Sequence, residues 1–118
     1  MSQEIVYDTA IIGGGLAGLS VAIELASSGH KVLLLEKEAY PYHKVCGEYI
    51  SMESKPFLQH LGIPFESLQL PIINKLIVSA PNGNLLQQPL SLGGFGISRY
   101  KLDDMLKEIA LQKGVTIL

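Results

Sequence analysis

The chain has 118 residues, of which 47% are hydrophobic and 17% charged, so we expect one small globular domain rather than a disordered segment. Nine Lys and Arg residues against eleven Asp and Glu residues give a net charge of −2, which argues against a nucleic-acid partner or a polybasic membrane surface. The single cysteine, Cys46, excludes an intrachain disulfide, and no apolar run approaches the roughly 20 residues of a membrane span. The first residues also lack the basic segment of a secretory signal. We therefore expect a cytoplasmic protein without a transmembrane segment, while peripheral contact with a membrane stays open.

The first third of the sequence predicts a strand, a helix and a second strand. Residues 5–12 are rich in β-branched residues and end at a cluster of glycines, which is typical of a buried strand. Residues 16–28 carry apolar residues at intervals of three or four and end before Gly29, as an amphipathic helix does. Residues 31–36 form a second apolar run that an acid closes. This order predicts two parallel strands with a right-handed crossover.

The rest of the chain predicts a hairpin, a further helix and a third strand. An Asn-Gly pair, which accepts positive φ, lies between two extended runs and indicates a β-hairpin. A stripe of apolar residues before Gly114 indicates the helix. In chain order, the expected elements are a loop at 38–47, a short helix at 52–61 that Pro56 limits, a connector at 64–71, hairpin strands at 74–80 and 85–89, an extended piece at 95–98, a helix at 102–112 and a strand at 115–118.

A glycine-rich loop, Gly13-Gly14-Gly15-Leu16-Ala17-Gly18, joins the first predicted strand to the first predicted helix. It satisfies the pattern G-x-G-x-x-G, which is weak alone in a chain with 12 glycines but specific between a strand and a helix. The first glycine permits a tight turn, the second lets a diphosphate approach the backbone, and the third lets the helix pack closely on the strand. The helix N-terminus adds free N–H groups and a partial positive charge. The loop therefore predicts a dinucleotide-binding site.

Glu36 ends the second predicted strand, 18 residues after Gly18. A carboxylate at this place accepts hydrogen bonds from a ribose diol and repels a 2′-phosphate, which disfavours NADP as the ligand of this unit. The alternative is that the glycines only form turns and that Glu36 is a solvated strand end. The order of strand, loop, helix, strand and acid favours the nucleotide site.

These segments resemble a known family. Residues 6–18, 29–32 and 36–37 are similar to the N-terminus of FAD-dependent oxidoreductases related to p-hydroxybenzoate hydroxylase. The Lys-Val-Cys-Gly-Glu stretch at 44–48 and the Arg-x-x-Leu-Asp segment at 99–103 resemble most the subgroup of geranylgeranyl reductases and electron-transfer-flavoprotein dehydrogenase-like proteins. The resemblance implies an α/β fold, with a Rossmann-like FAD-binding βαβ unit, a parallel sheet, and a β-hairpin that belongs to the sheet of a substrate domain.

The resemblance also implies contacts between individual residues and FAD. The implied contacts are the diphosphate with Gly13, Gly14, Gly15, Leu16, Ala17 and Gly18, the ribose with Glu36, the adenine with Lys37, the flavin end with Lys44, Val45, Cys46 and Gly47, and the ribityl-phosphate region with Arg99. For Arg99 and Lys44 the alternative is an ordinary surface residue. For Cys46 the alternatives are a thiol that tunes the flavin and a small packed residue without reactivity. No catalytic residue stands out, and no set of residues has the spacing of metal ligands.

We expect the chain to divide into an FAD-binding segment at 1–72, a hairpin excursion at 73–98 and a return to the FAD-binding domain at 99–118. In a doubly wound sheet the order runs third, second and first strand and then onward, which leaves one edge of the first strand without a partner. An apolar open edge invites aggregation. The sequence is therefore expected to be an incomplete N-terminal part of a larger fold, completed by the rest of the same enzyme or by a partner chain at that edge.

The function that the resemblance implies is that of an FAD-dependent oxidoreductase, either a reductase or dehydrogenase-like enzyme or a monooxygenase. The implied electron donor is NAD(P)H or another donor, and the implied substrate is a small molecule, for example a lipid or an aromatic compound. This segment alone is expected to be inactive, because it supplies only the site for the ADP moiety. The alternatives are a non-catalytic nucleotide-binding module or split-flavoprotein fragment and, ranked lower, an NAD-binding Rossmann domain.

Overall fold

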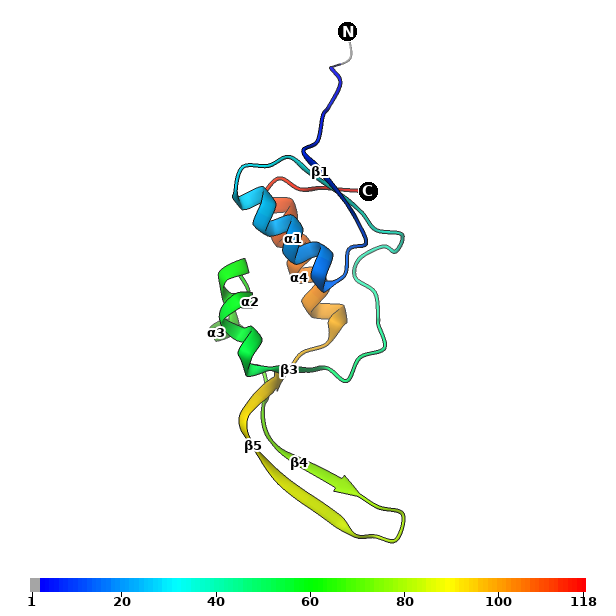
Figure 1. Ribbon diagram of the computed structural model, residues 1–118, viewed down its shortest axis with the longest axis vertical. Coiled ribbons are helices and arrows are strands. Elements are labelled where there is room, and N and C mark those ends of the chain that lie inside the picture. Colours follow the sequence, from blue (N-terminus) through cyan, green and yellow to red (C-terminus); the bar gives the residue numbers. More distant parts are fainter. Residues whose placement is uncertain (1–2) are drawn as a thin grey trace.

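A parallel sheet and an antiparallel sheet lie toward opposite ends of an elongated molecule in the computed structural model, which describes residues 3–118 (Figure 1). The principal extents are 72 × 27 × 21 Å. The elements in chain order are β1 (Thr9–Ile12), α1 (Leu16–Ser27), β2 (Val32–Leu35), β3 (Tyr49–Ser51), the 3-10 helix η1 (Met52–Ser54), α2 (Lys55–Leu61), α3 (Phe65–Leu68), β4 (Ile72–Ser79), β5 (Leu85–Gly96), α4 (Arg99–Gln112) and β6 (Thr116–Ile117).

The parallel sheet has the strand order β1-β2-β6, as expected from the sequence. Thr9 lies opposite Val32, and Leu33 lies opposite Thr116. The predicted first strand at 5–12 is too long, since β1 begins only at Thr9. The reason is that Asp8 and Thr9 both donate to the carbonyl of Lys31, the residue just before β2, so the chain upstream extends past the start of β2 (Figure 1).

The core lies between one face of this sheet and the two helices α1 and α4. Helix α1 forms where the apolar stripe predicts it, and it packs on β2 and on α4. The residues that are at most 1% exposed in these three elements are Leu19, Ala22, Ile23, Val32, Leu34, Leu102, Leu106 and Ala110. The two stripes predicted from the sequence therefore face each other across a common core.

Helix α4 begins three residues earlier than its apolar stripe predicts. It starts at Arg99 because Ser98 caps it, with the Ser98 hydroxyl accepting the N–H of Lys101 at 3.2 Å. A serine cap of this kind satisfies one of the free amides of the first turn. The earlier start is what places Arg99 on the helix rather than in the preceding connection.

The predicted hairpin is present and longer than expected. β4 pairs with β5 from Ile72 opposite Phe95 to Ser79 opposite Leu85, and the turn between them has Gly83 at φ +89°. β5 continues to Gly96, so the first half of the expected separate piece at 95–98 is the end of this strand. The three-residue strand β3, which the sequence did not predict, pairs with that end. Gly94 makes this pairing possible, because a Cβ there would collide with the Ile50 carbonyl.

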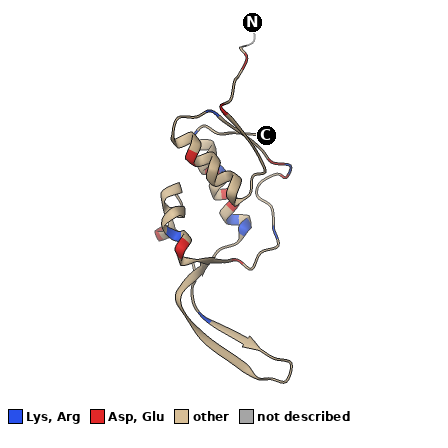
Figure 2. Cartoon of the chain, viewed as in Figure 1, with Lys and Arg blue, Asp and Glu red and all other residues tan. Residues whose placement is uncertain are grey.

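The connection between β3 and β4 is mostly helical. The expected helix at 52–61 is split into η1 and α2, and Pro56 occupies the first turn of α2, where its missing N–H costs nothing. The expected connector at 64–71 contains the single turn α3. Most charged residues belong to the helices and the loops outside the hairpin, and Lys75 is the single charged residue of β4 and β5 (Figure 2). Within residues 3–118, none of the helices has the length and apolar character needed to cross a membrane.

Replacement of Leu106 by alanine tests the shared core. Leu106 is 0% exposed between α4 and α1, so Leu106→Ala should lower the free energy of unfolding by about 2–5 kcal/mol. The matched control is Leu111→Ala on the same helix, which should cost less than about 0.5 kcal/mol because Leu111 is 44% exposed. Urea unfolding of both variants measures the difference, and equal costs would contradict the packing described.

Candidate functional site

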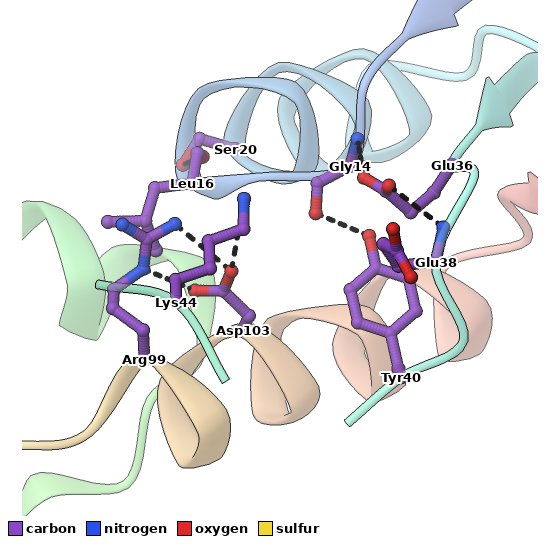
Figure 3. Close-up of polar contacts among 9 residues, drawn as sticks. All are labelled: Gly14, Leu16, Ser20, Glu36, Glu38, Tyr40, Lys44, Arg99 and Asp103. Carbon is purple, nitrogen blue, oxygen red and sulfur yellow. Dashed lines mark hydrogen bonds and ion pairs between the residues drawn. The ribbon is translucent and has the colours of Figure 1, made fainter. Parts of the chain in front are cut away.

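The glycine loop turns the chain from β1 directly into α1 (Figure 3). Gly13 has φ +101°, and its N–H donates to the Leu35 carbonyl at 2.8 Å, which extends the pairing of β1 with β2. A Cβ on Gly18 would collide with the Gly13 carbonyl, so helix and loop approach as closely as the motif requires. Gly15 is the N-cap of α1 and, having no side chain, makes no side-chain cap for this helix. The first helical amides are therefore available to a ligand, with the positive end of the helix dipole behind them.

Glu36 lies at the end of β2 and faces the glycine loop (Figure 3). Its Oε2 accepts the N–H of Gly14 at 2.7 Å, and its Oε1 accepts the N–H of Glu38 at 3.1 Å. Burial alone would raise the pKa of Glu36, but these two backbone hydrogen bonds, a hydrogen bond from the Tyr42 side chain and the charge of Lys44 outweigh it and hold the pKa below its ordinary value. The carboxylate is therefore ionised, and its remaining lone pairs can accept hydroxyl groups.

A pocket of about 680 Å³ opens between the loop and the end of β2. Gly13, Gly15, Glu36, Lys37 and Lys44 are among the residues that line it. The structure thus brings the predicted turn glycines, acid and two lysines around one space. A diphosphate needs backbone amides and cations, and a ribose needs a carboxylate, so this space offers the chemistry of a nucleotide site.

Two cations from distant parts of the sequence meet beside Gly15. A Cβ on Gly15 would lie 3.1 Å from Lys44 Nζ and 3.8 Å from Arg99 Nη2. The sequence placed Lys44 at the flavin end and Arg99 at the ribityl-phosphate region. The structure places both at the start of α1, and their contact with a cofactor stays a prediction.

Asp103 holds these two cations in place and was given no role by the sequence. Its side chain is 3% exposed and binds Arg99 through two hydrogen bonds of 2.7 and 3.0 Å, while Lys44 Nζ lies 4.0 Å away (Figure 3). The hydrogen bonds to Asp103 are the main cause of a raised pKa at Arg99, with a smaller contribution from Cys46. The available signal in the sequence was the spacing of Arg and Asp four residues apart on one helix.

Tyr40 is a second residue that the sequence did not single out. Its hydroxyl donates to the carbonyl of Gly14, from a loop in which no periodic pattern is present. Nothing in the local sequence predicts this contact, since it depends on how the loop after β2 folds back over the glycines.

The other predicted site residues lie around this centre. Leu16 and Ala17 begin α1 and line a separate, mostly apolar hollow of about 390 Å³. Val45, Cys46 and Gly47 are exposed in the loop before β3 and are not among the residues that line the larger pocket. Cys46 Sγ accepts the N–H of Glu48 at 3.4 Å. The roles implied for these five residues stay predictions.

Comparison with known proteins gives a consistent family assignment. Residues 8–45 match the family of FAD dependent oxidoreductases (DAO). The chain is 31% identical over 109 residues to the geranylgeranyl diphosphate reductase of Rhodobacter capsulatus, an alignment that covers 92% of this chain and 26% of the relative. It is 30% identical over 120 residues to a 1H-pyrrole-2-carbonyl peptidyl-carrier-protein brominase of Pseudoalteromonas luteoviolacea, with 98% of this chain and 29% of the relative covered.

Solved structures agree with this assignment. The myxobacterial chondrochloren halogenase, described as a variant of FAD-dependent halogenases, superposes with a TM-score of 0.80 at 28% identity over 97% of this chain and 28% of that structure. The p-nitrophenol 4-monooxygenase of Pseudomonas putida shares the fold, with a TM-score of 0.80 at 16% identity over 98% of this chain and 32% of that structure. The chain spans less than a third of the length of each of these proteins.

Replacement of Asp103 by asparagine tests the cation cluster. Asp103→Asn keeps the shape but leaves Arg99 without its buried counter-charge, so it should lower the free energy of unfolding by about 2–3 kcal/mol. Glu108→Gln on the same helix is the matched control, because its side chain is 56% exposed and its ion pair should contribute less than about 1 kcal/mol. Denaturant titration compares the two, and an Asp103→Asn variant as stable as the control would contradict the cluster.

The pKa of Glu36 predicts a pH dependence. The pKa of this carboxyl is lower in the folded than in the unfolded chain. Its charge therefore stabilises the fold fully when the pH is above the ordinary pKa of 4.5, and this contribution is lost as the pH falls through the pKa of the folded chain. The stability advantage of the native chain over Glu36→Gln should therefore be constant from about pH 8 to about pH 5 and shrink below that. Urea unfolding of both proteins across this range measures it, and a constant difference down to about pH 3 would contradict the prediction.

Proposed function

This chain belongs to the superfamily of FAD-dependent oxidoreductases, and we propose that its glycine loop and Glu36 bind the ADP half of FAD. The diphosphate binds at the start of α1, and the ribose diol donates hydrogen bonds to the Glu36 carboxylate. The observation that carries the proposal is one pocket bounded both by the uncapped start of a helix and by an ionised acid at the end of the neighbouring strand.

The residues around the pocket fit this group. A side chain on residue 15 would fill the space beside Lys44 and Arg99. Because this residue is glycine, that space is open to a diphosphate. Asp103 cancels one of these two positive charges, so the cluster keeps a net charge of about +1 next to the helix dipole. An anion with two negative charges is attracted there, while Glu36 lies at the other part of the pocket, where the ligand presents uncharged hydroxyls.

The proposal extends to the intact enzyme. The bound flavin supplies the redox chemistry, NAD(P)H is the proposed electron donor, and the substrate is a small molecule, either lipid or aromatic. Lys37 borders the adenine, and Lys44 to Gly47 lead toward the flavin. The role of the residues described here is to bind and orient the cofactor, which explains why no catalytic acid or base is assigned to them.

The proposal also divides the chain into functional parts. Segments 1–72 and 99–118 form the FAD-binding part, and 73–98 begins the substrate domain. The parallel pairing of β1, β2 and β6 supports the first assignment, although β3 pairs with β5 across the boundary. The open edge of β1 is the proposed contact with the rest of the enzyme or with a partner chain.

The second candidate is a nucleotide-binding module without catalysis. It is favoured by the observation that the groups lining the pocket, the glycine loop, Glu36 and Lys44, suit a diphosphate and a ribose and include no evident catalytic acid or base. Visible absorbance of the purified protein separates the two candidates. A flavin spectrum supports the oxidoreductase, and colourless protein that binds ADP supports the module.

Replacement of Glu36 by glutamine tests the ribose site. The native chain should bind ADP more tightly than 2′-phospho-ADP, because the carboxylate repels the added phosphate. Glu36→Gln should weaken ADP binding by about tenfold and narrow the preference between the two ligands. Titration calorimetry measures both affinities. Glu53→Gln, an exposed acid on η1, is the control and should change neither. An unchanged preference in Glu36→Gln would contradict the proposed site.

A further inference from the structure

We propose that Tyr40 is a positioning residue that fixes the Gly14 peptide and, through it, the amides that receive the diphosphate. This inference rests on the proposed function of the glycine loop and deepens it. It gives a role to Tyr40, which belongs neither to the glycine motif nor to the proposed ribose contact.

The peptide groups on both sides of Gly14 are held by side chains (Figure 3). The N–H of Gly14 donates to Glu36 Oε2 at 2.7 Å, and the carbonyl of Gly14 accepts the hydroxyl of Tyr40. A Cβ on Gly14 would collide with the Tyr40 hydroxyl and would lie 3.0 Å from Leu34 Cδ2. Gly14 is therefore enclosed by side chains rather than free to rotate.

The planarity of the peptide bond turns this contact into a constraint on the next amide. In a trans peptide the C=O of one residue and the N–H of the next lie in one plane and point in opposite directions. When Tyr40 holds the Gly14 carbonyl on its own side, the Gly15 N–H must point to the opposite side. Gly15 is the N-cap of α1 and lies beside Lys44 and Arg99, so this amide belongs to the proposed diphosphate site.

The surroundings of Tyr40 keep it a donor in a fixed place. Its ring is partly buried and packs on the core, with the Tyr42 ring centroid 5.6 Å away and Lys107 Nζ from α4 at 6.0 Å from its own centroid. Burial and the negative charge of Glu36 raise the pKa of Tyr40, so the hydroxyl keeps its proton at any physiological pH. The titratable groups that act on Tyr40 are Glu36, Tyr42 and Asp103, and Lys107 lies over its ring.

Removal of the hydroxyl alone tests the inference. Tyr40→Phe keeps the packed ring but frees the Gly14 carbonyl, so the affinity for ADP and for FAD should fall about fivefold, as expected for one lost hydrogen bond. Adenosine lacks the diphosphate, so its affinity should not change. Tyr49→Phe is the matched control, because this tyrosine is 41% exposed on β3 in the other sheet. Titration calorimetry with the three ligands gives all the affinities.

The outcomes separate the two proposals. If the native chain binds neither ADP nor FAD, the proposed function fails, and the inference fails with it. If the native chain binds ADP and Tyr40→Phe binds it equally well, the positioning role alone is wrong. If Tyr40→Phe loses affinity for adenosine as much as for ADP, Tyr40 supports the structure in general and does not orient the diphosphate amides.

A double-mutant cycle with Gly14 gives an independent measurement. Gly14→Ala should lower the melting temperature and the ADP affinity, because the new methyl group meets the Tyr40 hydroxyl. In the Tyr40→Phe background the same change should cost less, since the colliding atom is gone. Melting temperatures of the four proteins report the coupling even where ADP binding is lost. Additive effects in both measurements would overturn the enclosure of Gly14.

Discussion

The hydrogen bond from the Gly14 amide to the Glu36 carboxylate connects the two strands that build the site. The register of the parallel sheet makes it possible, because Ile12 lies opposite Leu35 and the next residue on each strand therefore reaches the same edge. From there β1 continues into the glycine loop, and β2 continues into Glu36. Together with the bond from the Gly13 amide to the Leu35 carbonyl, this contact ties the glycine loop to the end of β2, where the pocket opens.

The same contact explains how an acid is tolerated beside an anion site. An unpaired carboxylate next to a diphosphate would repel it, but Glu36 is already bound by two backbone amides and lies near the positive end of α1. These groups stabilise the charged form and leave other lone pairs for neutral hydroxyls. The acid therefore distinguishes the ribose end of the pocket from the diphosphate end, where Lys44 contributes positive charge beside Gly15.

Short-range patterns in the sequence predicted most of this arrangement. The strand, glycine loop, helix, strand and acid follow one another within residues 9–36, so their geometry depends on neighbours along the chain. The Asn-Gly turn of the hairpin is local in the same way. The sequence did not predict β3, because three residues carry no periodic signal and their partner on β5 is more than 40 residues away. It also placed the start of α4 too late, since the apolar stripe begins after the Ser98 cap.

The site residues missed by the sequence share this dependence on tertiary structure. Tyr40 lies in a loop without periodicity, and its position is decided by its contact with the glycine loop. Asp103 looks like an ordinary polar position on a helix until burial and two cations give it a role.

Asp103 also resolves a conflict in the electrostatics of the site. Arg99 and Lys44 repel each other, and both lie next to the positive end of α1, so their placement there would be unfavourable without a negative charge nearby. A buried carboxylate between them compensates for that repulsion and, because it binds Arg99 with two hydrogen bonds, fixes the orientation of the guanidinium. The cluster can then be assembled before an anion arrives. Preassembly matters because ordering these long side chains during binding would oppose the affinity, whereas here the ordering cost is met when the chain folds.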